Sequence, residues 1–473
     1  MTETKSSRQA IQRVAGGLLG IIIGVIIARN SPPNGLTVQA MSGMGIFACA
    51  VVWWIADVLP DYVTGILMCT AWVFFEVVPF PKAFAAFSGD TVWLLVGALG
   101  IGLAVTKSGL LNRTSLFLMS KFPPNFKGQT LALLFAGNII APLIPSTTAK
   151  VAIVAPFAQA ISDHLGFSRK SRGAGGLFAA MYMGFGATGP VFLSASFIGY
   201  TLKGSLPLAY QAQITWMNWF AAACVYGIIL FIGSYFAIQF LYQPDEESQM
   251  ERGYIRTELA KLGPIKRNEK IVMGVLVISL LMWMTEKTHG IAAALVALVA
   301  LCVLLAFEIF DRTDFKSGIG WDSVIFIGSI IGLATVLPAL QIDKWIATML
   351  GSTITPLLSN VYLFVIAGAI MTYLLRFVIV SMTAIVSIFT VLLAPFALNA
   401  GVNPWVTGFI VFASAQVFNI AYQNSGYLAG FYATGGEMVN HRQMAKMSIA
   451  YMIISCIGLL ACVPIWRIMH LIP

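Results

Sequence analysis

Two segments of the chain repeat one hydroxyl-rich phrase. Residues 143–158 read LIPSTTAKVAIVAPFA and residues 378–397 read VIVSMTAIVSIFTVLLAPFA, so that Ser-x-Thr-Ala is followed each time by Ala-Pro-Phe-Ala. A helix that starts just after the serine exposes free backbone N–H groups and a positive dipole end, which together form a site for an anion. The hydroxyl residues at the cap and in the first turn of these helices are Ser146, Thr147, Thr148, Ser381 and Thr383.

The apolar tract after each repeated segment is interrupted by residues that break helices. MGFGATGPVF (183–192) has three glycines and a proline within seven residues, and AYQNSGYLAG (421–430) has Gln423 to Gly426 in a row. Glycine packing between intact membrane helices is the alternative for the first stretch. We interpret both as unwound helices, whose free oxygens suit a hard cation such as sodium. We assign Asn424 and Ser425 to the anion site beside the hydroxyls.

One basic residue, Lys150, lies inside the first repeated segment. An ionised side chain in an apolar tract is functional by default, because burying it costs at least ~2.5–3.5 kcal/mol. Lys150 lies four residues after Ser146, on the same helical face. We expect it to contact a substrate carboxylate or to take the place of a bound cation, with snorkelling to water as the alternative. For Arg376, five residues before Ser381, we expect snorkelling or helix capping.

The composition places these residues in a membrane. Of the 473 residues, 58% are hydrophobic and 10% are charged, and the mean hydropathy is +0.85. A soluble domain carries about a quarter charged residues, so the chain is predicted to be an all-α, multi-pass membrane protein. The six cysteines fall in apolar stretches without C-x-x-C spacing, which indicates neither disulfides nor metal ligands.

Eleven tracts are long and apolar enough to be read as transmembrane helices, each of which needs roughly 20 residues. They cover residues 14–28, 40–59, 62–80, 91–110, 173–203, 215–242, 271–286, 289–309, 321–341, 404–430 and 449–470. The first tract follows three basic residues, as in a signal peptide, but no A-x-A cleavage site comes after it. We therefore predict an uncleaved span.

Two further tracts, 129–162 and 361–398, contain the repeated segments. Only 41 residues separate Lys127 from Arg169, which is barely enough for two crossings and a turn. One interpretation is a pair of short spans joined at the outer surface, and the other is a re-entrant hairpin whose tip stops inside the membrane. Such a tip is tolerated where protein or a watery cavity surrounds it. The repetition of the phrase in the second half favours the hairpin.

The distribution of Lys and Arg sets the orientation. With the N-terminus inside and both hairpins re-entrant, 20 of the 28 Lys and Arg residues fall on the inner side and six on the outer side. This bias predicts a cytoplasmic N-terminus and an outer C-terminus. The formal charge of +9 is therefore an orientation signal, and a nucleic-acid partner is not expected.

The mixed-charge loop 243–270 divides the chain into two comparable halves. An N-terminal segment, 1–35, holds the extra first span; the repeats cover 36–242 and 271–473. Each repeat has the same order of spans, hairpin and broken helix, with an odd number of crossings, so the halves have inverted topology. Inverted repeats are typical of secondary transporters, with the substrate site at the midplane where the repeats meet.

At these residues the sequence resembles the divalent anion/sodium symporter family of dicarboxylate, citrate and sulfate carriers. The likeness extends from about residue 40 to the end and includes SGDTVWLLVGALGIGLAVTKSGLLNR (88–113). The Pro-Ser-x-Thr-Ala-basic run resembles the citrate and plastid dicarboxylate branch. The resemblance implies a homodimer, with a scaffold domain and a transport domain that moves like an elevator. It also implies two sodium sites, around Ser146, Thr147 and Gly186 and around Ser381, Met382 and Gln423.

The chain departs from the family pattern at both hairpin tips. The family motif is Ser-Asn-Thr, but Thr147 and Met382 stand at the asparagine positions. A threonine hydroxyl can still coordinate sodium, whereas a thioether is a poor ligand for it. Sodium symport and anion exchange therefore both remain open.

We thus expect a secondary transporter of small di- or tricarboxylates in a bacterial-type inner membrane, with no cofactor apart from co-transported sodium. The alternatives are a sulfate or other oxyanion carrier and, more remotely, an anion channel or a membrane enzyme. The sequence shows no Ser/His/Asp constellation, zinc spacing or phosphate loop that would favour an enzyme. Asp57 and Glu76 lie near span ends outside the repeated elements, so no carboxylate is expected to couple protons.

Overall fold

A computed structural model describes residues 2–245, 249–251, 253–346, 348–349 and 360–473 of the chain. Every named element in this part is helical, as the composition predicted. Six of the helices are long and apolar enough to cross a membrane on length and composition, and four shorter ones are also apolar. The count of eleven spans remains a prediction. Within the predicted loop 243–270, residues 246–248 and Arg252 lie outside the described part.

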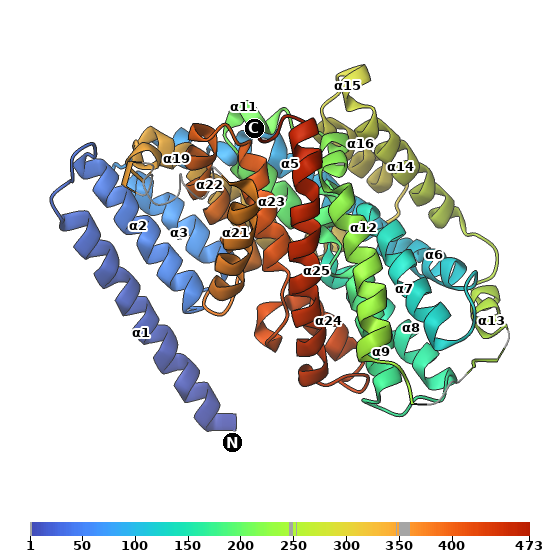
Figure 1. Ribbon diagram of the computed structural model, residues 1–473. Helices are drawn as coiled ribbons and strands as arrows, with labels where there is room; N and C mark the ends of the chain where they lie inside the picture. Colours follow the sequence, from blue (N-terminus) through green and yellow to red (C-terminus); the bar gives the residue numbers. More distant parts are fainter. Residues whose placement is uncertain (1, 246–248, 252, 347, 350–359) are drawn as a thin grey trace.

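The N-terminal helices form one flank of the molecule (Figure 1). They are α1 (Thr2–Arg29), α2 (Val38–Ile55) and α3 (Asp61–Phe74). Helix α1 packs on α2 through glycines, since a Cβ added at Gly24 would come within 2.8 Å of the Gly45 carbonyl oxygen. The N-terminus lies at the lower end of the molecule in this view and the C-terminus at the upper end (Figure 1). Their position on opposite sides of a membrane remains a prediction.

The rest of the first half contains a hairpin and a broken helix. Its elements are α4 (Phe80–Ala83), η1 (Ala85–Ser88), α5 (Asp90–Ser108), α6 (Leu110–Met119), α7 (Phe126–Ile140), η2 (Ala141–Leu143), α8 (Thr147–His164), α9 (Arg172–Phe185), η3 (Gly189–Val191), η4 (Leu193–Ala195), α10 (Phe197–Ser205), α11 (Leu208–Gln211) and α12 (Trp216–Leu241). Helix α6 was not predicted. It continues after Gly109, whose φ of +84° turns the chain between α5 and α6.

The second half also contains a hairpin and a broken helix, and the inverted repeat remains a prediction. The elements of this half are α13 (Tyr254–Lys261), α14 (Arg267–Met284), α15 (Glu286–His289), α16 (Ala293–Ala306), α17 (Arg312–Gly318), α18 (Trp321–Ile331), α19 (Leu333–Ala339), α21 (Val361–Leu375), α22 (Met382–Asn399), α23 (Pro404–Ala415), η5 (Ala421–Gln423), α24 (Ser425–Ala433) and α25 (His441–Ile468). Helix α25 begins eight residues before the predicted span, because Asn440 caps it through a hydrogen bond from the Gln443 amide.

The two halves interlock around the hairpins. Helix α8 of the first hairpin packs on α24, the second piece of the other half's broken helix, and α22 of the second hairpin packs likewise on α10. Helices α12 and α25 lie against each other beside this group, while α3 and α18 pack together on the side of α1 and α2 (Figure 1). Each hairpin tip is thus held by the opposite half.

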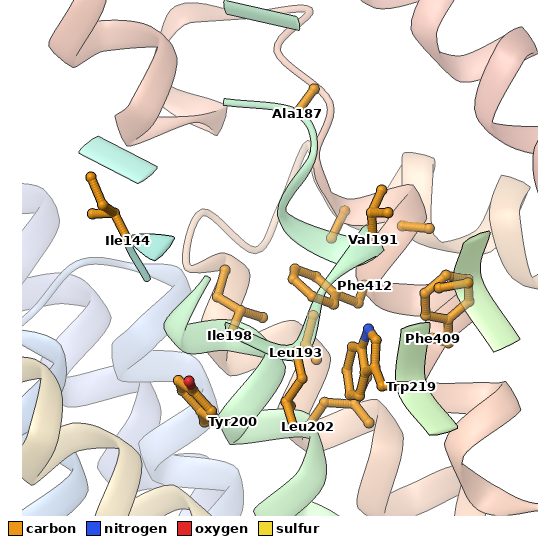
Figure 2. Close-up of a cluster of buried hydrophobic side chains, with 14 of the residues drawn as sticks. Ile144, Ala187, Val191, Leu193, Ile198, Tyr200, Leu202, Trp219, Phe409 and Phe412 are labelled. Atoms are coloured by element: carbon orange, nitrogen blue, oxygen red, sulfur yellow. The ribbon is translucent and has the colours of Figure 1, made fainter. Parts of the chain in front are cut away.

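The unwound stretch 186–196 is buried, and its backbone finds partners inside the protein. Val191 and Leu193 lie among apolar side chains that include Trp219 and Phe412 (Figure 2). The Trp219 indole donates a hydrogen bond to the Pro190 carbonyl (2.9 Å), and the Ser194 hydroxyl donates one to the Pro142 carbonyl (2.7 Å). Irregular backbone is tolerated at membrane depth where protein satisfies it in this way.

Candidate functional site

The first hairpin turns through a buried segment between α7 and α8. Ala141, Ile144 and Pro145 are buried, and Ser146 caps α8 by accepting a hydrogen bond from the Ala149 N–H (3.3 Å). The Ser146 hydroxyl also lies 3.2 Å from that of Thr148. The turn before the cap is buried, and Ser146, Thr147 and Thr148 are half-buried, so the re-entrant hairpin remains a prediction.

The second hairpin makes the same kind of turn between α21 and α22. Ser381 caps α22 by accepting a hydrogen bond from the Ala384 N–H (3.3 Å). The segment before it differs from the first hairpin, because Phe377, Val378 and Val380 are exposed. The two tips therefore share a cap but not an environment.

The break in the second broken helix is wider than predicted. Helix α23 ends at Ala415, and α24 begins only at Ser425. Asn424 caps α24 by accepting a hydrogen bond from the Tyr427 N–H (3.1 Å), and its amide donates to the Gln416 carbonyl (3.2 Å). Asn424 and Ser425, which the sequence analysis assigned to the anion site, thus form the cap and the first residue of α24.

The break in the first broken helix starts where the sequence predicted and ends later. Helix α9 ends at Phe185 with Gly186 as its cap residue, but α10 begins only after Ser196. Ser196 accepts a hydrogen bond from the Ile198 N–H (3.3 Å), and the Phe197 N–H donates to the Pro145 carbonyl of the first hairpin (3.0 Å). The start of α10 is thereby fixed to the hairpin turn.

These four helix starts surround one cavity of about 450 Å³. Its lining includes residues from the first turns of α8, α10, α22 and α24, namely Thr147, Thr148, Phe197, Ile198, Met382, Thr383, Ser425 and Gly426, and the caps Ser196, Ser381 and Asn424. The starts of α8 and α24 approach each other closely at this cavity, because a Cβ added at Gly426 would lie 2.9 Å from Thr147 Cγ2. Four converging dipole ends with free N–H groups and hydroxyls favour a negatively charged ligand.

The predicted contact between Lys150 and a substrate carboxylate is not supported by the position of the lysine. Its side chain is fully buried and is not among the residues that line the cavity. The ammonium group donates to the Ala195 carbonyl (2.8 Å) and, at 3.4 Å, to the Ala141 carbonyl. These oxygens belong to the unwound stretch and to the hairpin turn. Lys150 thus lies between two irregular segments, where it neither reaches the surface nor lines the cavity, and its role in place of a bound cation remains a prediction.

Arg376 has an equivalent position in the second half. Its side chain is fully buried, and its guanidinium donates to the carbonyls of Ile379 (2.7 Å) and Val380 (2.5 Å) in the hairpin turn. It also donates to the carbonyl of Gln423 in the unwound stretch, while the Gln423 amide donates back to the Arg376 carbonyl (3.2 Å). Arg376 is therefore buried and does not reach water by snorkelling. Besides binding the carbonyls of the hairpin turn, it joins this turn to the broken helix.

Two of the predicted ion ligands lie away from the cavity. Gly186 is buried at the end of α9, and Ser146 lies behind Thr147 and Thr148, which do line the cavity. In the second half, Ser381, Met382 and Gln423 all reach the lining. The first predicted ion site therefore reaches the cavity through Thr147 alone, whereas all three residues of the second line it.

The wall opposite the hairpins was missed by the sequence analysis. It consists of Trp54, Asp57, Pro60, Asp61 and Tyr62 around the start of α3, with Asp322, Ser323 and Phe326 of α18. Asp57 had been set aside as a carboxylate near a span end. The sequence did offer a signal for two of these residues, because Asp61 and Asp322 are charged residues in the first turn of a helix. Ser196, Gln416 and Tyr422 of the lining were also not predicted.

Sequence comparisons agree with a transport role. The profile described as "Sodium:sulfate symporter transmembrane region" matches residues 12–472. The putative malate transporter YflS of Bacillus subtilis is 27% identical over 364 residues, which cover 75% of this chain and 76% of that protein. Inner membrane protein YbhI of Escherichia coli is 28% identical and covers 70% of this chain and 72% of its own length. The chloroplastic dicarboxylate transporter 2 of Spinacia oleracea is 26% identical, and the match covers 73% of this chain and 62% of that protein.

Solved structures support the fold. The YdaH transporter of Alcanivorax borkumensis superimposes with a TM-score of 0.56 at 15% identity, over 83% of this chain and 89% of that one. MtrF of Neisseria gonorrhoeae superimposes with a TM-score of 0.56 at 14% identity, over 97% of this chain and 94% of that one. At such low identity the likeness concerns the arrangement of helices alone.

Proposed function

This chain belongs to the sodium:sulfate symporter family and is an integral membrane anion transporter, and we propose that it exchanges small dicarboxylate anions across the membrane. The observation that carries the proposal is the meeting of four helix N-termini, two from each half, on one cavity. Each pair suits one carboxylate group. The cavity of about 450 Å³ is also larger than a single tetrahedral oxyanion such as sulfate would fill.

The relatives point in the same direction. YflS is named as a putative malate transporter, and several plastid relatives are named as dicarboxylate transporters. Malate and other four-carbon diacids carry two negative charges at neutral pH, one at each end. Tricarboxylates such as citrate are the less favoured part of the substrate class, because a third carboxylate would face Asp57, Asp61 and Asp322 in the wall opposite the hairpins.

We propose exchange rather than sodium symport because of the two buried cations. Family resemblance placed a sodium ion between each hairpin turn and the neighbouring unwound stretch. In this chain, Lys150 and Arg376 donate to carbonyl oxygens of those same pairs of segments. A fixed positive charge there offsets substrate charge without a mobile ion. With Met382 at the second tip, sodium also loses an asparagine ligand.

The moving part in this proposal is the interlocked group of hairpins and broken helices, which would slide against the flank of α2, α3 and α18. Asp57 and Asp322 at the cavity wall are exposed, and Asp57 pairs with Arg13 of α1 (2.7 Å). Because Asp57 pairs with Arg13 near the N-terminus, this side of the cavity lies on the side of the predicted cytoplasmic N-terminus. The cavity then opens towards the cytoplasm, with the C-terminus outside. A homodimer joined through the static flank and a bacterial-type inner membrane complete the proposal.

Uptake into proteoliposomes tests both parts of it. Vesicles are loaded with malate, loaded with sulfate or left empty, and labelled malate, succinate, citrate or sulfate is added outside with sodium or with choline. We expect malate and succinate to enter malate-loaded vesicles at the same rate in both salts, and to enter empty vesicles at no more than a few per cent of that rate.

Other results would change the proposal in defined ways. Uptake into empty vesicles that follows a sodium gradient would replace exchange by symport and leave the substrate class intact. Sulfate uptake without dicarboxylate uptake would make the protein an oxyanion carrier. Flux that neither saturates nor responds to internal substrate would indicate a channel.

A further inference from the structure

Three side-chain amides of the second broken helix line the cavity, and they differ in what binds them. Gln416, Gln423 and Asn424 are all buried, with at most 2% of each residue exposed. An amide has two donor hydrogens and an acceptor oxygen, and a buried amide is normally bound at both ends. A buried amide that the protein leaves unbound is therefore open to a ligand.

Protein groups already bind the amides of Gln423 and Asn424. The Gln423 oxygen accepts a hydrogen bond from the Ile420 N–H (3.0 Å), and its nitrogen donates one to the Arg376 carbonyl (3.2 Å). Both ends of the Asn424 amide are bound to backbone groups in the same way. These two amides hold the backbone of the break in place.

The Gln416 amide has no such task. Its backbone carbonyl accepts from the Asn424 amide, but its side-chain nitrogen and oxygen make no hydrogen bond to any described residue. Neither atom is among the buried polar atoms that the protein closes off from solvent. The side chain is thus 2% exposed, belongs to the cavity lining and presents an unbound amide there.

Gln416 lies between the two broken helices. Its backbone carbonyl binds the amide of Asn424, the cap of α24. Its Nε2 atom lies beside the first break, since a Cβ added at Gly189 would lie 3.0 Å from it and 3.3 Å from the Cβ of Ser196. Ser196 is the cap of α10, so Gln416 is next to one helix start from each half. If each half binds one carboxylate, the unbound amide faces the carbon chain between the two carboxylates.

We propose that Gln416 binds a hydroxyl group on the carbon chain of the substrate and makes the carrier selective for hydroxy dicarboxylates. A hydroxyl donates and accepts, as the amide does, so the two groups satisfy each other. A substrate that has only methylene groups at this point displaces water from the amide and leaves it unpaired, which weakens binding. Sites that bind a substrate hydroxyl reject the analogue that lacks it for this reason.

The inference rests on the proposed dicarboxylate function and narrows its substrate class from four-carbon diacids in general to those that carry a hydroxyl, such as malate. The test compares malate with succinate, which has the same two carboxylates and the same chain length without the hydroxyl. Exchange into malate-loaded vesicles gives a KM for each labelled substrate. We expect the wild-type KM for malate to be about tenfold below that for succinate.

The central variant is Gln416→Met, which keeps an unbranched side chain of similar length and removes the amide. We expect the two KM values to come within about twofold of each other. The value for malate should rise, because its hydroxyl loses its partner, and the value for succinate should fall, because no amide is left unpaired.

Ser381→Ala is the matched control, since it removes a cap from a helix start that binds a carboxylate in both substrates. It should raise both KM values by the same factor and keep their ratio. Equal KM values in the wild type would overturn the inference and leave dicarboxylate exchange in place. The same follows if Gln416→Met raises both values equally, as a general structural effect would.

A second measurement does not depend on transport. Malate or succinate is added to the purified protein in detergent, and the rise in Tm is followed as a function of concentration, because a ligand of the folded state raises it. We expect malate to act at about tenfold lower concentrations than succinate in the wild type, and both to act at similar concentrations in Gln416→Met.

If Gln416→Met shows no cooperative unfolding, Gln416→Asn takes its place, since it keeps an amide but draws it back by one carbon, and it should lose the same preference. A variant of either kind that unfolds cooperatively and still prefers malate as the wild type does would overturn the role of Gln416 alone. Stabilisation by neither diacid would overturn the proposed substrate class, and the role of Gln416 with it.

Discussion

The two hairpins hold a buried cation in different ways. At the first hairpin the cation is Lys150, one turn into the inner helix, and its two carbonyl partners, Ala141 and Ala195, are themselves fully buried. At the second it is Arg376, placed before the turn, and one of its partners, Val380, is an exposed residue of the cavity lining. What the halves share is therefore the location of the charge between turn and unwound stretch, and not the position of the residue in the chain.

The difference has a chemical reason. A guanidinium is a planar fork that reaches three carbonyls at once, whereas an ammonium is a compact charge that suits a tight enclosure. The second site borders the cavity, so water can replace its side chain more readily than at the enclosed first site. The two hairpins should therefore respond unequally to the loss of their cations.

The largest effect is expected for Lys150→Ala. Two buried carbonyls lose their donor, at about 1–3 kcal/mol each, and the hairpin turn is no longer joined to the unwound stretch. We expect exchange to fall by about 100-fold or more, measured as the initial rate of malate uptake. High sodium should restore part of this rate, because the emptied space has the oxygen ligands that sodium takes.

Lys203→Ala is the control for Lys150→Ala, since it removes a buried lysine from α10 rather than from a hairpin. It should leave the rate insensitive to sodium. A Lys150→Ala protein that folds, exchanges at the wild-type rate and ignores sodium would remove the first cation from the mechanism.

A smaller effect is expected for Arg376→Ala, with a loss of about tenfold in the exchange rate. Water from the cavity can hydrate the Val380 carbonyl after the guanidinium is removed. Arg376→Lys keeps the charge but not the fork, and should recover part of the rate. An Arg376→Ala loss equal to or greater than that of Lys150→Ala would reverse the order of the two sites.

The caps should behave alike in both hairpins. Ser146→Ala and Ser381→Ala each remove one capping bond, worth about 1 kcal/mol, which corresponds to about a fivefold rise in the KM for malate. Ser171→Ala removes the equivalent cap of α9, whose serine accepts a bond from the Ala174 N–H; unlike the first turns of α8 and α22, the first turn of α9 contributes no residue to the cavity lining. That control should leave the KM within about twofold, and a shift as large as the hairpin caps produce would show a general effect on stability.

The smallest effect is expected where the family asparagine is put back at each tip. Thr147→Asn and Met382→Asn should each change the exchange rate by less than about twofold and should not introduce sodium dependence, because Lys150 and Arg376 already bind the carbonyls of each turn. Uptake in sodium and in choline measures this directly. Sodium stimulation of Met382→Asn alone would mean that a second cation fits beside Arg376.

Much of the helix order followed from the sequence, because prolines, glycines and hydroxyl caps act locally. Ser146 and Ser381 lie at helix starts where local patterns had placed them, and Asn424 lies in the predicted interruption of its span. Residues whose role depends on a distant segment were not found. Periodicity shows which face Lys150 occupies, but its partner Ala195 is 45 residues away and lies in a break that extends past Pro190.

The same limit explains the missed wall of the cavity. Asp61 and Asp322 come from helices that meet only through the packing of α3 on α18. No spacing in the chain brings them to the hairpins. Ser196 was within reach, since a serine before Phe-Ile-Gly-Tyr is a reasonable helix cap, but no glycine or proline drew attention to it.

The two buried cations have an electrical consequence for the proposed carrier. A dianion bound between them would offset these two charges, so the loaded carrier would move two fewer positive charges through the field of the membrane than the empty carrier. Each charge moved through that field contributes about 2.3 kcal/mol for each 100 mV. In a cell whose interior is negative, voltage alone would then hold the empty carrier facing the cytoplasm until a substrate from inside releases it.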